Sequence, residues 1–158
     1  MKELEYPFDA AYIIKKRKSL KKALLADGTS RIRKKIAVFG GSTTSDIVKT
    51  LELFLLDAGI EPEFYESEYA QYFQDAMFPD ETLLSFKPDI VFIHTTNRNV
   101  TDWPEMTDTT EQIDEKLHTE INRFTAMWKS IAEKFHCPII QNNFEMPLYR
   151  LLGSRDAW

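Results

Sequence analysis

The sequence predicts an α/β protein, a three-layer α/β/α sandwich with a parallel sheet of the flavodoxin-like kind. Three observations support this prediction. Short apolar runs alternate with helical patterns in the order strand, helix, strand, helix, strand, helix, strand. The run from Ile90 to Ile93 is continuously apolar, as in a central strand that is buried on both faces. A first strand ends in Gly40-Gly41, directly before a helical pattern.

Length and composition fit one globular domain. The chain has 158 residues, of which 43% are hydrophobic and 13% aromatic, enough to build a core and too apolar for a disordered segment. No apolar run approaches the roughly 18 residues that a membrane span needs. Charges from Lys2 onward interrupt any signal-peptide pattern, and the single cysteine, Cys137, allows no internal disulfide. We therefore expect a cytoplasmic protein.

The N-terminal part of the chain is strongly basic. Residues 1–35 hold eleven Lys/Arg and four Asp/Glu, a net charge of +7, whereas residues 36–158 hold nine and twenty-one, a net charge of -12. The pattern predicts an amphipathic helix at 8–26 and a linker, which we separate as residues 1–34 from an α/β domain at 35–158. The basic face suits nucleic acid or anionic lipid. We favour a solvated face against an acidic body, because no nucleic-acid-binding motif accompanies the basic residues, so nucleic acid and membrane are not expected partners.

The first half of the α/β domain begins with a strand at 36–39. A helix follows from Ser45, ended by a left-handed cap at Gly59, and a short strand follows at 63–66. The aromatic stretch at 65–78 has no clear periodicity. It either floors a pocket, with Tyr69, Gln71 and Gln74 toward a ligand, or packs as a loop over the edge of the sheet. A short helix is expected at 80–86.

The second half contains the longest predicted element. After the strand at 90–94 and a polar loop, an apolar stripe predicts a helix at 110–136 that packs on the sheet. The stripe consists of Ile113, Leu117, Ile121, Phe124, Trp128, Ile131 and Phe135. Thr109 and Gln112 form a capping-box pattern at its start. A last strand is expected at 138–141, followed by an irregular tail.

Three loops follow predicted strands, at 40–45, 94–99 and 142–145. The carboxyl ends of parallel strands meet at one edge, where α/β proteins bind ligands. We expect that edge to bring together Gly41, Ser42, Thr43, Thr44, His94, Asn97, Arg98, Asn99, Asn142 and Asn143. A hydroxyl nucleophile, helix N–H groups and an asparagine amide suit acyl transfer. Arg98 also suits a plain anion pocket.

The roles of two of these residues stay open. Ser42 is either a nucleophile or a turn and cap residue, since hydroxyls at a helix start are common caps. His94 is either a general base or a packing residue at the end of an apolar strand. No His, Cys, Asp and Glu set has metal-ligand spacing, and no phosphate-loop or dinucleotide motif is present, so no metal or cofactor is expected.

Four separated blocks of the sequence resemble the N-terminal region of FkbH-like proteins, which carry a haloacid-dehalogenase-superfamily phosphatase domain of subfamily IIIC. The blocks lie at 36–44, 67–78, 88–99 and 140–153, and they read IAVFGGSTT, SEYAQYFQDAMF, PDIVFIHTTNRN and IQNNFEMPLYRLLG. The resemblance covers nearly the whole chain. It implies an SGNH-hydrolase fold in which Ser42 matches the nucleophile and Asn97 the oxyanion asparagine.

The sequence departs from the SGNH pattern at three points. Gly40-Gly41-Ser42 stands for Gly-Asp-Ser, Thr95-Thr96-Asn97-Arg98 stands for Gly-x-Asn-Asp, and no Asp-x-x-His supplies a base. No Asp-x-Asp phosphatase motif precedes Trp158. We therefore expect a C-terminally truncated domain whose parent protein also holds a phosphatase-like domain.

The resemblance implies a role in glyceryl or acyl transfer to an acyl carrier protein in polyketide-like biosynthesis. With an incomplete triad, the fragment itself is expected to be weakly active or inactive, and whether it is an enzyme stays open. The alternative is a non-catalytic module that binds an anion or a carrier protein through Arg98 and the turn at 40–45.

Overall fold

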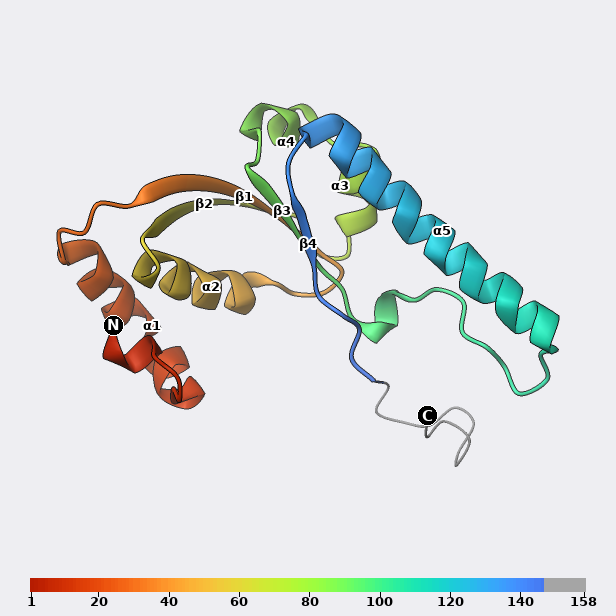
Figure 1. Ribbon diagram of the computed structural model, residues 1–158, viewed down its shortest axis with the longest axis horizontal. Helices are drawn as coiled ribbons and strands as arrows, with labels where there is room; N and C mark the ends of the chain where they lie inside the picture. Colours follow the sequence, from red (N-terminus) through yellow and green to blue (C-terminus); the bar gives the residue numbers. More distant parts are fainter. Residues whose placement is uncertain (147–158) are drawn as a thin grey trace.

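The computed structural model describes residues 1–146 and contains the predicted parallel sheet. Its four strands lie in the order β2-β1-β3-β4, and every neighbouring pair is parallel. The strands are β1 (Ile32–Gly40), β2 (Ile60–Glu66), β3 (Ile90–His94) and β4 (Ile139–Gln141). Figure 1 shows helices on both sides of this sheet, so the three-layer α/β/α fold class is confirmed.

The helices follow the predicted pattern closely. They are α1 (Ala10–Ala26), α2 (Ser45–Asp57), α3 (Tyr72–Met77), α4 (Glu81–Phe86) and α5 (Thr110–Phe135), with short 3-10 turns η1 (Lys2–Leu4) and η2 (Asn97–Asn99). Gly59 follows α2 with a φ of 82°, as the predicted left-handed cap requires. The capping box of Thr109 and Gln112 at the start of α5 is also confirmed.

One face of the sheet packs against α3, α4 and α5. Ala37 and Phe39 of β1 and Val91 and Ile93 of β3 are buried there, together with side chains from these helices. Alternate residues of a strand face opposite sides of the sheet, so the odd-numbered positions of both central strands face this core. It is the larger of the two cores that contact the sheet.

The other face carries α2, and α1 packs on the outside of α2. Ile36 and Val38 contact Val48 of α2, while Ile13 and Leu24 of α1 are buried in a separate cluster that includes Leu53 and Leu56. The basic N-terminal helix is thus an outer layer of the fold (Figure 1). The predicted division at residue 34 stays a prediction, although β1 itself begins at Ile32.

The predicted apolar stripe of α5 is only partly correct. Phe124 and Ile131 are buried as expected, but Leu117, Ile121 and Trp128 are 55%, 51% and 41% exposed. The buried side of α5 consists of Glu120, Phe124, Met127 and Ile131. The spacing of apolar residues reports a face of the helix, but not how far the sheet beneath that helix extends.

The aromatic stretch at 65–78 packs against the core in its second half. Tyr72 and Ala76 of α3 are buried against α5, whereas Tyr69 is 75% exposed and Gln71 and Gln74 are exposed. Within residues 1–146, no helix is long and apolar enough to cross a membrane.

Candidate functional site

The carboxyl ends of the strands bring two of the three predicted loops into direct contact. Gly40 at the end of β1 is in register with His94 at the end of β3. The Gly41 N–H donates to the His94 carbonyl at 2.8 Å, which extends the pairing of the strands by one step. The turn that carries Ser42 therefore starts beside the loop that carries Asn97 and Arg98.

Asn99 locks these two loops together. Its Nδ2 donates to the Gly41 carbonyl at 3.0 Å, and its Oδ1 accepts from the Thr96 N–H at 2.8 Å. Thr96 and Asn99 form a capping box around η2, whose central residue is Arg98. The Asn99 amide, predicted to bind substrate, thus holds the protein's own backbone.

The hydroxyls before α2 have separate environments. Thr44 is buried, and its Oγ1 donates to Glu66 Oε1 at 2.7 Å. Ser42 is half-buried and Thr43 is exposed. Thr44 occupies the N-cap position, but the start of α2 has no side-chain cap. The first N–H groups of α2 remain available to an anion, as helix N-termini generally are.

Within residues 1–146, Ser42 has no base hydrogen-bonded to it. Among residues 1–146, no hydrogen bond joins its hydroxyl to another side chain. The three histidines of the sequence are His94, His118 and His136, and the last two lie on α5 and at its end. His94 is half-buried, with its ring 6.2 Å from that of Phe92. It is the histidine at the same edge as Ser42, by its register with Gly40.

The side chains of Asn97 and Arg98, unlike that of Asn99, do not hold the neighbouring loop. The Asn97 N–H donates to Glu145 Oε2 at 3.1 Å, and its side chain is half-buried without a hydrogen bond within the described residues. Arg98 is exposed, and none of the ion pairs among residues 1–146 involves it. These two side chains are the ones that this loop can offer to a ligand.

The side chain of Asn142 holds the backbone at this edge of the sheet. Its Oδ1 accepts from the Thr95 N–H at 3.0 Å and its Nδ2 donates to the Thr95 carbonyl at 2.7 Å. The amide thereby continues the pairing of β3 with β4 after Gln141. Asn143, the next residue, is exposed.

One solved structure is similar to most of the chain. The crystal structure of the N-terminal part of the protein BF1531 from Bacteroides fragilis, containing a phosphatase domain complexed with Mg, aligns with a TM-score of 0.66 and 20% identity. The alignment covers 87% of this chain and 35% of that chain. This similarity shows the fold. The chain spans about a third of the length of that neighbour.

A second solved structure aligns only weakly. Ornithine transcarbamoylase from Giardia lamblia aligns over 86% of this chain and 33% of its own, but with a TM-score of 0.36 and 14% identity. No protein-family model matches the sequence, and no curated protein matches it.

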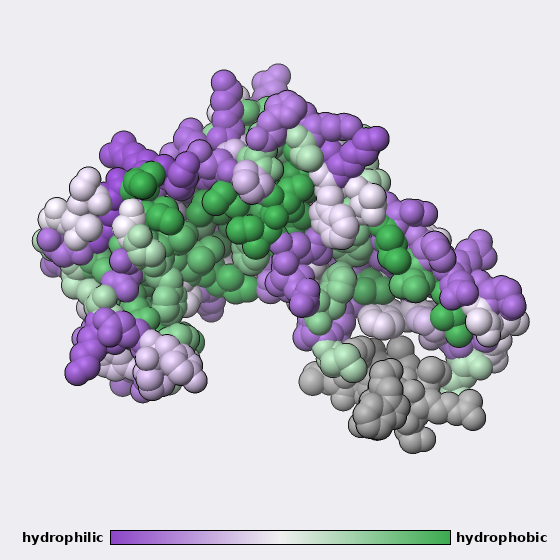
Figure 2. Space-filling model, in the orientation of Figure 1, coloured by the Kyte–Doolittle hydropathy of each residue, from purple (hydrophilic) through white to green (hydrophobic). Residues whose placement is uncertain are grey.

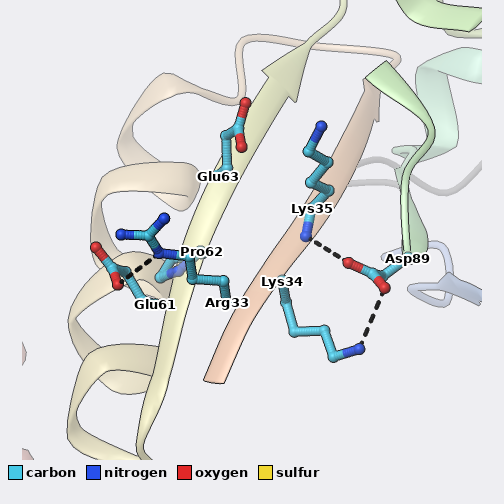
Figure 3. A pocket seen from close by; sticks show the side chains of 7 residues that line it. All are labelled: Arg33, Lys34, Lys35, Glu61, Pro62, Glu63 and Asp89. Atoms are coloured by element: carbon cyan, nitrogen blue, oxygen red, sulfur yellow. Dashed lines mark hydrogen bonds and ion pairs between the residues drawn. The ribbon is translucent and has the colours of Figure 1, made fainter. Parts of the chain in front are cut away.

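A hollow of about 550 Å³ lies at the opposite, amino-terminal end of the strands (Figure 3). Its charged side chains are largely paired with each other, Arg33 with Glu61 and Lys34 with Asp89. Hydrogen bonds from the Lys35 N–H and from Lys34 hold the pKa of Asp89 below its usual value. Charges that neutralise one another leave little attraction for a ligand.

Sequence reasoning missed three polar residues near the site. Ser67, directly after β2, is buried, and its hydroxyl has no hydrogen-bonding partner among the described residues. Glu120 is buried on α5 and pairs with Arg123 at 2.7 Å. Arg123 also donates to the Asn99 carbonyl at 2.6 Å and to the Tyr72 hydroxyl at 3.0 Å. Glu120 lies four residues before Phe124 and therefore on the same face of α5, and this spacing was the sequence signal for its burial.

Cys137 does not join this site as a nucleophile, and the described residues form no metal site. Cys137 packs against the core beside Ile139, and burial raises the pKa of its thiol. Within the part of the chain that the structure describes, no group of three or more His, Cys, Asp or Glu side chains is placed to hold a metal ion.

Proposed function

We propose that the chain is the SGNH-like N-terminal domain of an FkbH-type protein. In this proposal it holds an acyl or glyceryl group, or the carrier protein that bears it, at the edge formed by residues 40–45, 94–99 and 142–145. Transfer of that group is then a property of the full protein, together with its phosphatase-like domain. The solved neighbour supports this proposal because the N-terminal part of BF1531, which contains a phosphatase domain, includes a region with the fold of this chain.

The position of Ser42 is the observation that carries the proposal. Its hydroxyl lies between the end of β1 and the start of α2, whose N-terminus has no side-chain cap. The neighbouring loop, held by Asn99, presents Asn97 as an amide donor. A hydroxyl, free backbone N–H groups and an amide are the groups that bind a carbonyl and stabilise its oxyanion.

The chain alone is a weak enzyme in this proposal. A serine attacks a carbonyl efficiently only when a base removes its proton, and none contacts Ser42 within residues 1–146. His94 at the same edge, or a group from another part of the parent protein, must supply that base.

Hydrolysis of p-nitrophenyl acetate tests the role of Ser42. We expect slow turnover that Ser42→Ala abolishes and that Thr43→Ala, at the exposed neighbouring hydroxyl, retains. Equal turnover by Ser42→Ala and the unchanged protein would exclude Ser42 as the nucleophile.

A second candidate function is a non-catalytic module that binds the phosphate of a carrier protein's phosphopantetheine arm. The exposed Arg98, which has no ion pair within the described residues, favours this function together with the uncapped start of α2. Calorimetry with holo acyl carrier protein tests it. Arg98→Ala should weaken binding about tenfold, as expected for one charged hydrogen bond. Lys87→Ala should not, because Lys87 lies before the amino end of β3, the end opposite to Arg98.

A further inference from the structure

An ion pair on α5 holds the backbone at the end of η2. The Arg123 guanidinium donates to the Asn99 carbonyl at 2.6 Å, and the Glu120 carboxylate accepts from the Thr101 N–H at 3.1 Å. Arg123 and Glu120 pair with each other at 2.7 Å. The chain that leaves the second loop of the site is therefore held by two side chains that also hold one another.

Hydrogen bonds and aromatic rings together fix the position of Arg123. Its Nη1 donates to the Tyr72 hydroxyl on α3 at 3.0 Å, and its Nε donates to Glu120 at 3.1 Å. Its Cζ lies 4.5 Å from the centre of the Phe124 ring and 5.6 Å from that of the Phe73 ring. A planar fork that meets several acceptors and stacks on aromatic rings is specific to arginine. We therefore expect that lysine cannot replace Arg123.

The ion pair lies on the inner side of α5. Figure 2 shows hydrophilic residues along the outer side of this helix and apolar residues beneath it. The Glu120 and Arg123 side chains are only 10% and 19% exposed. Taking two charges out of water costs much of what their attraction returns, so such a pair adds little stability relative to apolar residues of similar size. The pair does give a fixed position to the groups that are hydrogen-bonded to it.

Asn99 connects Arg123 to both loops of the proposed site. The Asn99 Nδ2 donates to the Gly41 carbonyl at 3.0 Å, one residue before Ser42. Asn97 lies in the same 3-10 turn as Asn99. We infer that Arg123 is a positioning residue: acting through Asn99, it sets how the two loops of the proposed site lie relative to each other. Its importance for substrate rests on the proposed function, whereas the coupling of the loops does not.

NMR spectroscopy of Arg123→Lys tests this coupling without any substrate. The lysine keeps a positive charge beside Glu120 but lacks the planar fork. We expect the side-chain amide signals of Asn99 and the backbone amide signal of Gly41 to shift. Arg33→Lys, the same exchange at an 88% exposed side chain in the opposite half of β1, should shift neither. A folded Arg123→Lys protein in which both signals stay in place would overturn the inference.

A second variant weakens the same ion pair from its other side. Glu120→Gln keeps the shape of the side chain and removes the charge that holds Arg123. It should shift the Asn99 and Gly41 signals as well, whereas Glu133→Gln, at a side chain 65% exposed on the same helix, should not. Unchanged signals in Glu120→Gln would contradict the inference even if Arg123→Lys does not fold.

Turnover of p-nitrophenyl acetate tests whether this positioning serves the proposed site. An amide that meets only the developing oxyanion affects kcat rather than KM. A misplacement of about 1 Å can cost a hundredfold in rate. We therefore expect Arg123→Lys to lower kcat at least tenfold with little change in KM, and Arg33→Lys to change neither. An unchanged kcat in a protein whose Asn99 signals have shifted would refute the positioning role.

Failure of the proposed function gives a different result. In that case the chain shows no turnover that Ser42→Ala abolishes, yet the Asn99 and Gly41 signals still shift in Arg123→Lys. This outcome would reject the chemistry at Ser42 and support the coupling of the two loops through Arg123.

Discussion

The side chain of Asn99 occupies the space that a side chain at residue 41 would need. A Cβ at Gly41 would lie 2.4 Å from Asn99 Oδ1, closer than any real contact allows. The glycine before Ser42 and the asparagine after Arg98 are therefore coupled. This contact gives a local reason for the Gly-Gly-Ser of this chain: an aspartate at residue 41 has no room while Asn99 holds its place.

Gly41→Ala should destabilise the protein by about 1–3 kcal/mol, since overpacking forces the two loops apart. Urea unfolding measures this change. Gly41→Ala should cost less in an Asn99→Gly background than in the unchanged protein because the colliding amide is then absent. Thr43→Ala, in the same turn but exposed, is the control. An unchanged unfolding midpoint for Gly41→Ala would show that the loops are looser than this geometry.

Asn142 and Asn143 form a matched pair for the third loop. Asn142→Ala removes both hydrogen bonds to the Thr95 backbone and should cost about 1–2 kcal/mol of unfolding free energy. Asn143→Ala removes an exposed side chain and should cost nothing measurable. Thermal and urea unfolding of the two variants decide the matter, and equal stability of both would contradict the assigned role of Asn142.

Arg31 should anchor the basic N-terminal helix. Its buried guanidinium donates to the Leu24 carbonyl at 2.7 Å and its Nε to the Leu56 carbonyl at 2.8 Å, near the ends of α1 and α2, and it pairs with Asp27. Arg31→Ala should cost about 2–3 kcal/mol. Arg31→Lys should recover little because an ammonium cannot reach several acceptors in one plane. Proteolysis between α1 and β1 should accelerate in Arg31→Ala, and an unaltered cleavage rate would argue against this anchor.

Glu120 should make stability depend on acid pH. Burial raises the pKa of Glu120, but hydrogen bonds from Arg123 and Thr101 together lower it by more than burial raises it. The pKa in the folded protein therefore lies below the ordinary 4.5. The ionised carboxylate therefore stabilises the fold above about pH 4.5, and this contribution is lost as the pH falls through the folded value.

Glu120→Gln should thus unfold more easily at pH 7, by about 1–2 kcal/mol, with a smaller difference from the unchanged protein at pH 3. Glu133→Gln, on the same helix with its side chain 65% exposed, is the control. A stability difference that is the same at both pH values would show that the charge of Glu120 is not what matters.

The sequence predicted the strands, helices and layers well because each core strand has its own apolar run. The ends of β1 and β2 were harder. Arg33 was assigned to the linker and Lys35 to the position before the first strand, yet both lie in β1, in register with Glu61 and Glu63 of β2. Charged residues are tolerated at the open end of a strand, where hydrophobic patterning gives no signal.

The site was predictable only in its outline. The rule that loops meet at the carboxyl ends of parallel strands brought Ser42 and Asn97 to one edge, but it did not separate ligand-facing amides from structural ones. Asn99 bonds to Gly41, and Asn142 to Thr95, each across more than forty residues of sequence. Such pairings depend on tertiary positions that local patterns do not contain.

Hydrogen–deuterium exchange of the chain with and without glyceryl-loaded acyl carrier protein tests the central claim most directly. The proposed site predicts protection of residues 40–45, 94–99 and 142–145 on binding, with no change around Arg33 and Glu61 at the opposite end of the strands. Protection confined to that opposite end, or no protection at saturating carrier protein, would contradict the proposal that this edge holds the carrier-linked substrate.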